Sequence, residues 1–78
     1  MKFKVGDKVY CKHHKKYGFV IRIKRNTKYE IRVDIINKKG EALIKDVGYT
    51  EDGRWYINDN FKSLFKPIKI KVNKLLEL

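Results

Sequence analysis

The chain contains one cysteine, one proline and one alanine among its 78 residues. A single cysteine excludes an internal disulfide, which favours a reducing compartment such as the cytoplasm. No apolar run approaches the roughly 20 residues that a membrane span needs. The opening MKFKVGDKVY also lacks the apolar core of a signal peptide. We therefore expect a cytoplasmic protein with no membrane partner.

Patterns of catalysis and metal binding are also lacking. The sequence contains no Ser–His–Asp arrangement with supporting context and no glycine-rich phosphate loop. Three acids lie around turns, where acids are common for backbone reasons: Glu51, Asp52 and Asp59. Cys11 and His13 would share a strand face, but a structural zinc site needs four ligands, and His14 is the only other histidine. We expect no enzymatic activity, no metal and no cofactor.

Positive charge is abundant and unevenly placed. The chain has 20 Lys and Arg residues against nine acids, a formal net charge of +11. Residues 1–25 hold nine bases and one acid, residues 26–60 hold six bases and seven acids, and residues 61–78 hold five bases and one acid. A small domain with a basic face and a nearly neutral face is suited to a negatively charged partner.

Alternation of apolar and polar residues with a period of two dominates the chain, which is typical of half-buried β-strands. In residues 29–35, Tyr29, Ile31, Val33 and Ile35 fall on one side of the strand. The pattern predicts strands at residues 5–11, 19–24, 29–35, 42–49, 54–57 and 68–72. Gly48, inside the fourth of these, indicates a bulge or bend.

The predicted connections are short and rich in turn residues. Residues 26–28 and 37–40 join consecutive strands, and Asp52-Gly53 is a strong signal for a two-residue hairpin, because both residues tolerate positive φ. Residues 58–65 are expected to be an irregular stretch with a single 3₁₀ turn. Pro67 ends this stretch.

Five to six short antiparallel strands joined by tight turns predict an all-β meander in one domain. A sheet of this size must curl over one small core, so we expect a small, partly open barrel. The barrel is expected to occupy residues 1–67, and residues 68–78 to form a tail that is either a last strand or a short helical turn.

Two resemblances support this architecture. The opening hairpin resembles that of Tudor-like and other SH3-like barrels through Val5-Gly6-Asp7, Val9, His13 or His14, Tyr17-Gly18 and Val20. It is less similar to the C-terminal Tudor-like domains of repair helicases, because Phe19 replaces a glycine of their pattern. The segments YTEDGR (49–54) and SLF (63–65), together with the Gly-Asp-x-Val opening, resemble a group of small phage and prophage proteins.

The resemblances cover residues 3–67 and imply an SH3-like or Tudor-like barrel of phage or mobile-element origin. They place the protein in the cytoplasm of a bacterial host cell. They imply no particular activity, because no single function is known to be shared by that phage group.

The basic first hairpin is the candidate binding site. A two-stranded ribbon can lie against a duplex groove or follow a phosphate backbone. Lysine predominates over arginine, which favours phosphate neutralisation over the bidentate reading of bases. A solvated lysine-rich face and an acidic protein surface are the alternatives. The candidate nucleic-acid-binding residues are Lys8, Lys12, His13, His14, Lys15, Lys16, Tyr17, Arg22, Lys24 and Arg25.

Aromatic residues are numerous, at 13% of the chain. We expect Phe19, Tyr29, Phe61 and Phe65 to fill the core. Trp55 and Tyr56 are neighbours on a predicted strand, so their side chains should point to opposite faces. An exposed ring at Tyr10, Tyr17 or the Trp55–Tyr56 pair could stack on a base, whereas a cage for a methylated lysine would need three converging rings.

These observations predict a non-enzymatic, phage-type binding module that docks its basic hairpin on nucleic acid with low sequence specificity. The alternative is a protein-binding module that inhibits or redirects a host nucleic-acid-handling or defence enzyme through an acidic surface. The chain is expected to be a monomer or a weak dimer, with residues 49–57 as a candidate pairing edge.

Overall fold

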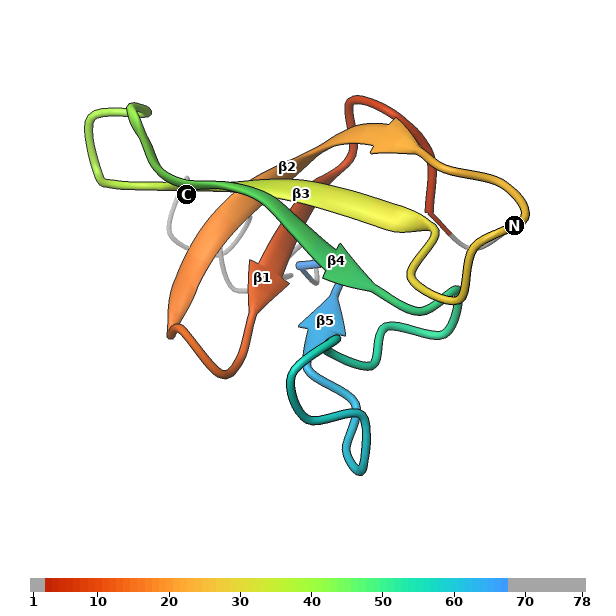
Figure 1. Cartoon of the computed structure of the whole chain (residues 1–78). Helices are drawn as coiled ribbons and strands as arrows, with labels where there is room; N and C mark the ends of the chain where they lie inside the picture. Colours follow the sequence, from red (N-terminus) through yellow and green to blue (C-terminus); the bar gives the residue numbers. More distant parts are fainter. Residues whose placement is uncertain (1–2, 68–78) are drawn as a thin grey trace, which may run out of the picture.

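A computed structural model describes residues 3–67, which form one antiparallel β-sheet of five strands (Figure 1). The strands are β1 (Lys8–Cys11), β2 (Lys16–Ile23), β3 (Ile31–Ile36), β4 (Ala42–Tyr49) and β5 (Leu64–Phe65). Their order in the sheet is β4-β3-β2-β1-β5. The first four strands are therefore a meander, and β5 returns to pair with the free edge of β1.

The predicted all-β class is confirmed, because the described residues contain no helix. None of these residues accordingly forms a helix that could span a membrane. The strand expected at 68–72 and the tail expected at 68–78 lie outside the described residues.

The segment between β4 and β5 curls back under the sheet (Figure 1). Isolated bridges join Tyr49 to Trp55 and Arg54 to Lys62. The Gly53 carbonyl accepts hydrogen bonds from the amides of Ser63 and Leu64, both at 2.8 Å. This pairing connects the end of β4 to the start of β5 and closes one end of the core.

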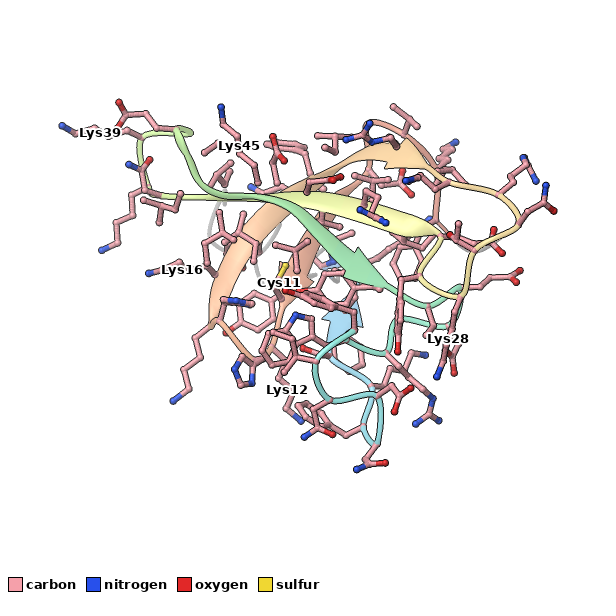
Figure 2. All side chains as sticks on the ribbon, in the orientation of Figure 1. Cys11, Lys12, Lys16, Lys28, Lys39 and Lys45 are labelled. Carbon is pink, nitrogen blue, oxygen red and sulfur yellow. The ribbon has the colours of Figure 1, made fainter. Side chains whose placement is uncertain are left out.

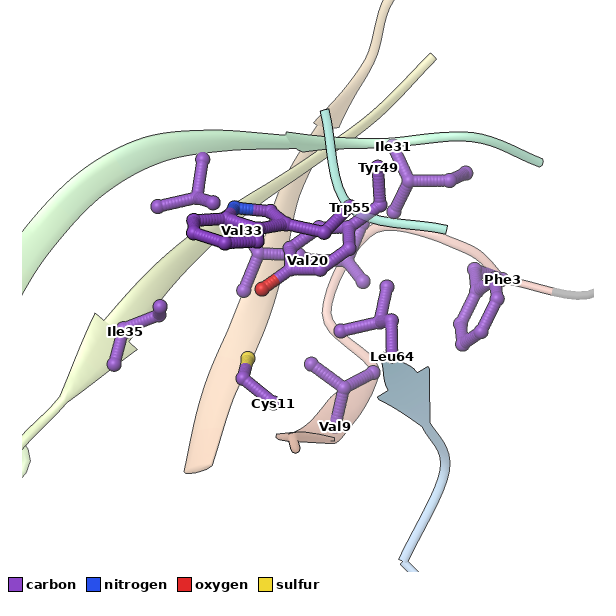
Figure 3. Close-up of a cluster of buried hydrophobic side chains, with 11 residues drawn as sticks. Phe3, Val9, Cys11, Val20, Ile31, Val33, Ile35, Tyr49, Trp55 and Leu64 are labelled. Atoms are coloured by element: carbon purple, nitrogen blue, oxygen red, sulfur yellow. The ribbon is translucent and has the colours of Figure 1, made fainter. Parts of the chain in front are cut away.

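The core lies on the concave side of the curled sheet (Figure 3). Along β3, Ile31, Val33 and Ile35 are all buried, as the alternation predicted. Burying side chains of this size stabilises the fold by about 1.5–3 kcal/mol each. Their buried partners come from every other strand, from the chain before β1 and from the segment between β4 and β5: Phe3, Val9, Cys11, Val20, Val47, Tyr49, Trp55 and Leu64.

The Tyr49 hydroxyl points toward the Cys11 thiol inside this core (Figure 3). Burial raises the pKa of the Cys11 thiol and raises the pKa of the Tyr49 hydroxyl above its usual range. Both groups therefore stay protonated at neutral pH. A protonated thiol without access to solvent is unreactive, so Cys11 acts as a small core residue.

The strand predicted at 54–57 is wrong, because only Arg54 and Trp55 pair, and each does so through one isolated bridge. Tyr56 and Ile57 are exposed. The irregular stretch expected over residues 58–65 is also wrong at its end, because Leu64 and Phe65 form β5 against β1, and residues 58–65 contain no 3₁₀ turn. A strand of two residues is too short to show a period, and its pairing depends on a partner more than 50 positions away.

The hairpin at Asp52-Gly53 has a three-residue loop, not the predicted two-residue loop. The Thr50 amide donates to the Arg54 carbonyl at 2.7 Å, and the Gly53 amide donates to the Thr50 carbonyl at 2.9 Å. Only Gly53 has a positive φ, +91°. This is a type I turn followed by a left-handed residue in a bulge, a geometry that requires glycine at one position only.

The same turn joins β3 to β4. The Asn37 amide donates to the Glu41 carbonyl at 2.9 Å, the Gly40 amide donates to the Asn37 carbonyl at 3.0 Å, and the φ of Gly40 is +85°. The Asn37 side chain also accepts hydrogen bonds from the amides of Lys39 and Glu41. The turn is therefore fixed by its own backbone and by one amide side chain, and it holds Lys38 and Lys39 at its tip.

The bulge expected at Gly48 lies two residues earlier. Gly48 pairs regularly with Arg32, whereas the register shifts between Val33 and Ile35 on the partner strand. The bulged residue is Asp46, which has a φ of 58°. Aspartate tolerates this left-handed conformation better than most residues, because its short side chain can hydrogen-bond locally.

Candidate functional site

A groove of about 510 Å³ lies between the β1–β2 turn and the β3–β4 turn. Gly18 pairs with Ile35, so the residues before Gly18 lie beside the residues after Ile35. Figure 2 shows the consequence, with Lys16 and Lys39 at the same end of the sheet. The groove is lined by five lysines, two aromatic rings, the last residue of β3 and the turn after it: Lys8, Lys15, Lys16, Lys38, Lys39, Tyr17, Phe19, Ile36, Asn37 and Gly40.

The lining carries five ammonium groups and no carboxylate. Within residues 3–67, no carboxylate forms an ion pair with any of the five lysines. Two acids adjoin the groove without lining it. Asp34 accepts a hydrogen bond from the Asp46 amide, and Glu41 accepts one from the Asn37 side chain. A concave surface of one charge sign concentrates counter-ions, so the groove is suited to an anion.

The floor of the groove is aromatic. Tyr17 and Phe19 stand on the outer face of β2, where their side chains are 45% and 40% exposed. The Lys8 ammonium lies 4.8 Å from the centre of the Tyr17 ring, and Tyr10 meets that ring edge-on at 5.2 Å. The site therefore combines cations with flat apolar faces that are open to a ligand.

Phe19 was predicted to lie in the core, and this prediction is wrong because Phe19 is exposed on the outer face of β2. The neighbouring Gly18 points inward instead, and a Cβ there would lie only 2.6 Å from the Asp34 carbonyl oxygen and 2.7 Å from Val33 Cγ1. Because only glycine fits this inward position, the next residue must point outward.

Phe65 was also predicted to lie in the core, and this prediction is wrong as well. It is exposed and pairs with Tyr10 of β1. Tyr29 and Phe61 are half-buried.

His13 and His14 lie against Trp55, outside the groove lining. The His13 ring stacks on the Trp55 ring at 3.9 Å, and the His14 ring meets it edge-on at 5.3 Å. The His13 amide donates to the Ser63 hydroxyl at 3.1 Å. Burial lowers the pKa of the His14 imidazole, and the neighbouring His13 lowers this pKa further. The two rings therefore cover one end of the core, and the lowered pKa of His14 keeps its imidazole neutral at pH 7.

Lys12 is held by its backbone, because its amide donates to the Ser63 carbonyl at 2.7 Å. Its side chain is exposed but does not line the groove. Lys12 therefore lies on the same turn as Lys15 without contributing to the concave surface.

Arg22 shares one carboxylate with a second arginine. It binds one carboxylate oxygen of Asp46 at 2.9 Å, and Arg32 binds the other oxygen at 3.0 Å. The Arg32 side chain also donates to the Tyr29 carbonyl at 3.1 Å. Asp46 thus links β2, β3 and β4 on the outer face. The Arg22 guanidinium is held in this ion-pair cluster.

Lys24 and Arg25 follow the far end of β2. The eight residues of β2 extend over roughly 25 Å at a rise of about 3.3 Å per residue. These two cations therefore lie at the opposite end of the sheet from the groove. Of the residues selected from the sequence, the structure brings Lys8, Lys15, Lys16 and Tyr17 together and leaves the other six outside the groove.

Lys38 and Lys39 were missed as site residues, although residues 37–40 were recognised as a turn. Their charges fall in the segment 26–60, whose bases and acids nearly balance. The only sequence signal was a pair of adjacent lysines at a turn tip. The pairing of β3 with β2 places this tip beside Lys16.

A second aromatic surface involves Tyr29 and Tyr56, whose ring centres are 6.2 Å apart. They flank a small pocket of about 250 Å³ together with Arg32, Asp46 and Gly48. Trp55 is 7% exposed and Tyr56 48% exposed, so one ring of this pair is exposed, as expected. Their ring centres are only 6.0 Å apart and the rings meet edge-on, so the predicted opposite orientation is wrong. The acid of this pocket already binds two arginines, which weakens it as a site for a further cation.

Comparison with protein families, with curated proteins and with solved structures finds no match to this chain. The resemblance to phage proteins and SH3-like barrels stays a prediction.

Proposed function

We propose that this protein is a non-enzymatic binding module whose groove holds nucleic acid through the phosphate backbone, with low sequence specificity. The observation that carries the proposal is the lining of five lysines without a carboxylate. The phosphates of a nucleic acid suit such a surface. Each ammonium group that neutralises a phosphate releases a condensed counter-ion from the nucleic acid, and this release favours binding.

Low specificity follows from the kind of cation. All five basic residues of the groove are lysines, which act as point charges on flexible stems. Sequence reading by side chains relies mainly on bidentate contacts from arginine or from amides. Asn37 is the only amide of the lining, and its side chain is engaged in the β3–β4 turn. The groove therefore favours the backbone over the bases' hydrogen-bonding edges.

We also assign the sheet to the SH3-like class and the chain to a phage-type accessory role. The strand order β4-β3-β2-β1-β5 and the return of β5 to β1 are compatible with a small barrel. The Gly-Asp-x-Val, YTEDGR and SLF segments support the phage-type assignment. The host is then a bacterium, and the ligand is host or phage nucleic acid.

Salt dependence tests the proposal directly. We expect the purified protein to bind a fluorescent oligothymidylate in an anisotropy titration at low salt. Neutralising five phosphates of a single strand gives a slope of about −3.5 in log K against log salt, so the affinity should fall about 100-fold between 50 and 200 mM salt. An affinity that does not change with salt contradicts the proposal. Failure of every oligonucleotide to bind contradicts it too and leaves an acidic surface of a host enzyme as the partner for the same lysines.

A further inference from the structure

The two rings on the floor of the groove are flat, apolar and open to solvent. Tyr17 and Phe19 expose 45% and 40% of their surfaces in a part of the described sheet where lysines gather around a concave surface. Pure phosphate neutralisation does not use such rings. Proteins that bind single strands without sequence preference combine a basic groove with aromatic side chains on which bases stack.

We infer that the ligand of this groove is a single-stranded nucleic acid whose unpaired bases stack on Tyr17 and Phe19. The inference rests on the proposed function and adds the strandedness of the ligand. In a duplex each base face is covered by its neighbours, so exposed rings meet only sugars, phosphates and groove edges. In a single strand the base faces are available, and every base offers one, which keeps the contact independent of sequence.

The spacing of the rings also favours an unstacked strand. Tyr17 and Phe19 are two residues apart on β2, on one face, so they are separated by about 6.6 Å. Stacked bases in a B-form strand repeat every 3.4 Å or so, about half this distance. Successive bases can therefore reach both rings only after they leave the regular stack, which a single strand does at far lower cost than a duplex.

The Lys8 ammonium occupies one face of the Tyr17 ring in the free protein, 4.8 Å from its centre. Lysine side chains are flexible, and a cation–π contact at an exposed site is weaker than base stacking. On binding, a base takes this face and the ammonium moves to an adjacent phosphate. Lys8 thereby protects the ring in the absence of ligand and neutralises charge in its presence.

The remaining lysines are placed to follow a strand across the rings. Lys15 and Lys16 lie on one border of the groove, and Lys38 and Lys39 lie on the opposite border at the tip of the β3–β4 turn. A nucleic-acid strand that crosses the floor of the groove therefore meets cations before, over and after the two rings.

The test compares an oligothymidylate of about 15 nucleotides with a blunt duplex of the same length, by anisotropy at low salt. We expect the wild-type protein to bind the single strand at least 10-fold more tightly. Tyr17→Leu keeps an apolar side chain but removes the aromatic face, so it should weaken single-strand binding by about 5- to 150-fold, the range for one stacked base. Tyr17→Phe should retain the wild-type affinity.

Tyr56→Leu is the matched control, because Tyr56 is 48% exposed and lies outside the groove. It should leave both affinities unchanged. Tyr17→Leu should also leave the salt slope unchanged, because the five lysines remain. Thermal unfolding of each variant confirms that the fold is intact.

The outcomes separate the two proposals. If single strand and duplex bind equally with steep salt slopes, or the duplex binds more tightly, the single-strand inference is overturned while the proposed function stands. The same holds if Tyr17→Leu binds like the wild type. If neither oligonucleotide binds at low salt, the proposed function fails first and the inference fails with it.

Discussion

Replacing Lys38 and Lys39 together by glutamate is expected to lower the affinity for a single-stranded oligonucleotide by about 100-fold or more at 0.1 M salt. Each phosphate neutralised on a single strand contributes about a factor of 5 at this salt concentration, so the two lost contacts account for about 25-fold. The two introduced carboxylates add repulsion on one border of the groove. Anisotropy titration measures the change.

The control is Lys24→Glu with Arg25→Glu, which makes the same change in net charge at the opposite end of β2. The distance along the strand is roughly 25 Å, well beyond the Debye length of about 10 Å at 0.1 M salt. We expect a loss of less than about 5-fold. If both double variants lose affinity equally, the net charge of the protein and not the groove governs binding, and the assignment of the site is wrong.

Gly53→Ala is expected to destabilise the protein by about 2–4 kcal/mol. The φ of Gly53 is +91°, and a Cβ at this position would lie 2.6 Å from the Leu64 carbonyl oxygen. The substitution therefore adds backbone strain and pushes β5 away from the hairpin that holds it. Stabilities of roughly 0.05–0.15 kcal/mol per residue are usual for small domains, so this loss is a large fraction of the total. Urea unfolding followed by Trp55 fluorescence measures it.

Gly40→Ala provides the comparison, because Gly40 occupies the same position of the same turn with a φ of +85° and has no heavy atom within 4 Å of the added Cβ. It should cost about 1 kcal/mol, which is the strain alone. Equal losses at the two glycines would show that the contact with Leu64 does not hold β5 in place.

The sequence predicted the strands and turns whose pattern depends only on residues that are close together in the chain. Ile31, Val33 and Ile35 alternate with polar residues and are all buried in β3, because a strand covered on one face by the core must follow a period of two. The turns at 26–28 and 37–40 were also predicted, since they contain residues that favour turns.

Two features were not predictable in this way: which face of β2 is buried, and the existence of β5. Apolar residues occupy both faces of residues 19–23, so alternation alone does not say which face is buried. The buried face is decided by Gly18, which lies so close to the Asp34 backbone that no Cβ fits there. The two residues of β5 form a strand only because Tyr10 and Cys11 on β1 lie opposite them.

The candidate site was predicted in part for the same reason. Charge counting along the chain identified the cations of the β1–β2 hairpin but grouped Lys24 and Arg25 with Lys15 and Lys16. Extended strands separate residues that are near in sequence, and pairing brings distant ones together. The contribution of residues 37–40 could be found only from the register of β2 and β3.

The most direct test of the groove as the binding site is a two-dimensional NMR titration of the isotopically labelled protein with an unlabelled oligothymidylate at low salt. We expect the amide resonances of residues 15–19 and 37–40 to shift together and to saturate with one affinity, while those of residues 24–28 and 50–57 stay in place. Shifts that are largest at residues 24–28, or that spread evenly over all the lysine-bearing surfaces, would contradict this account.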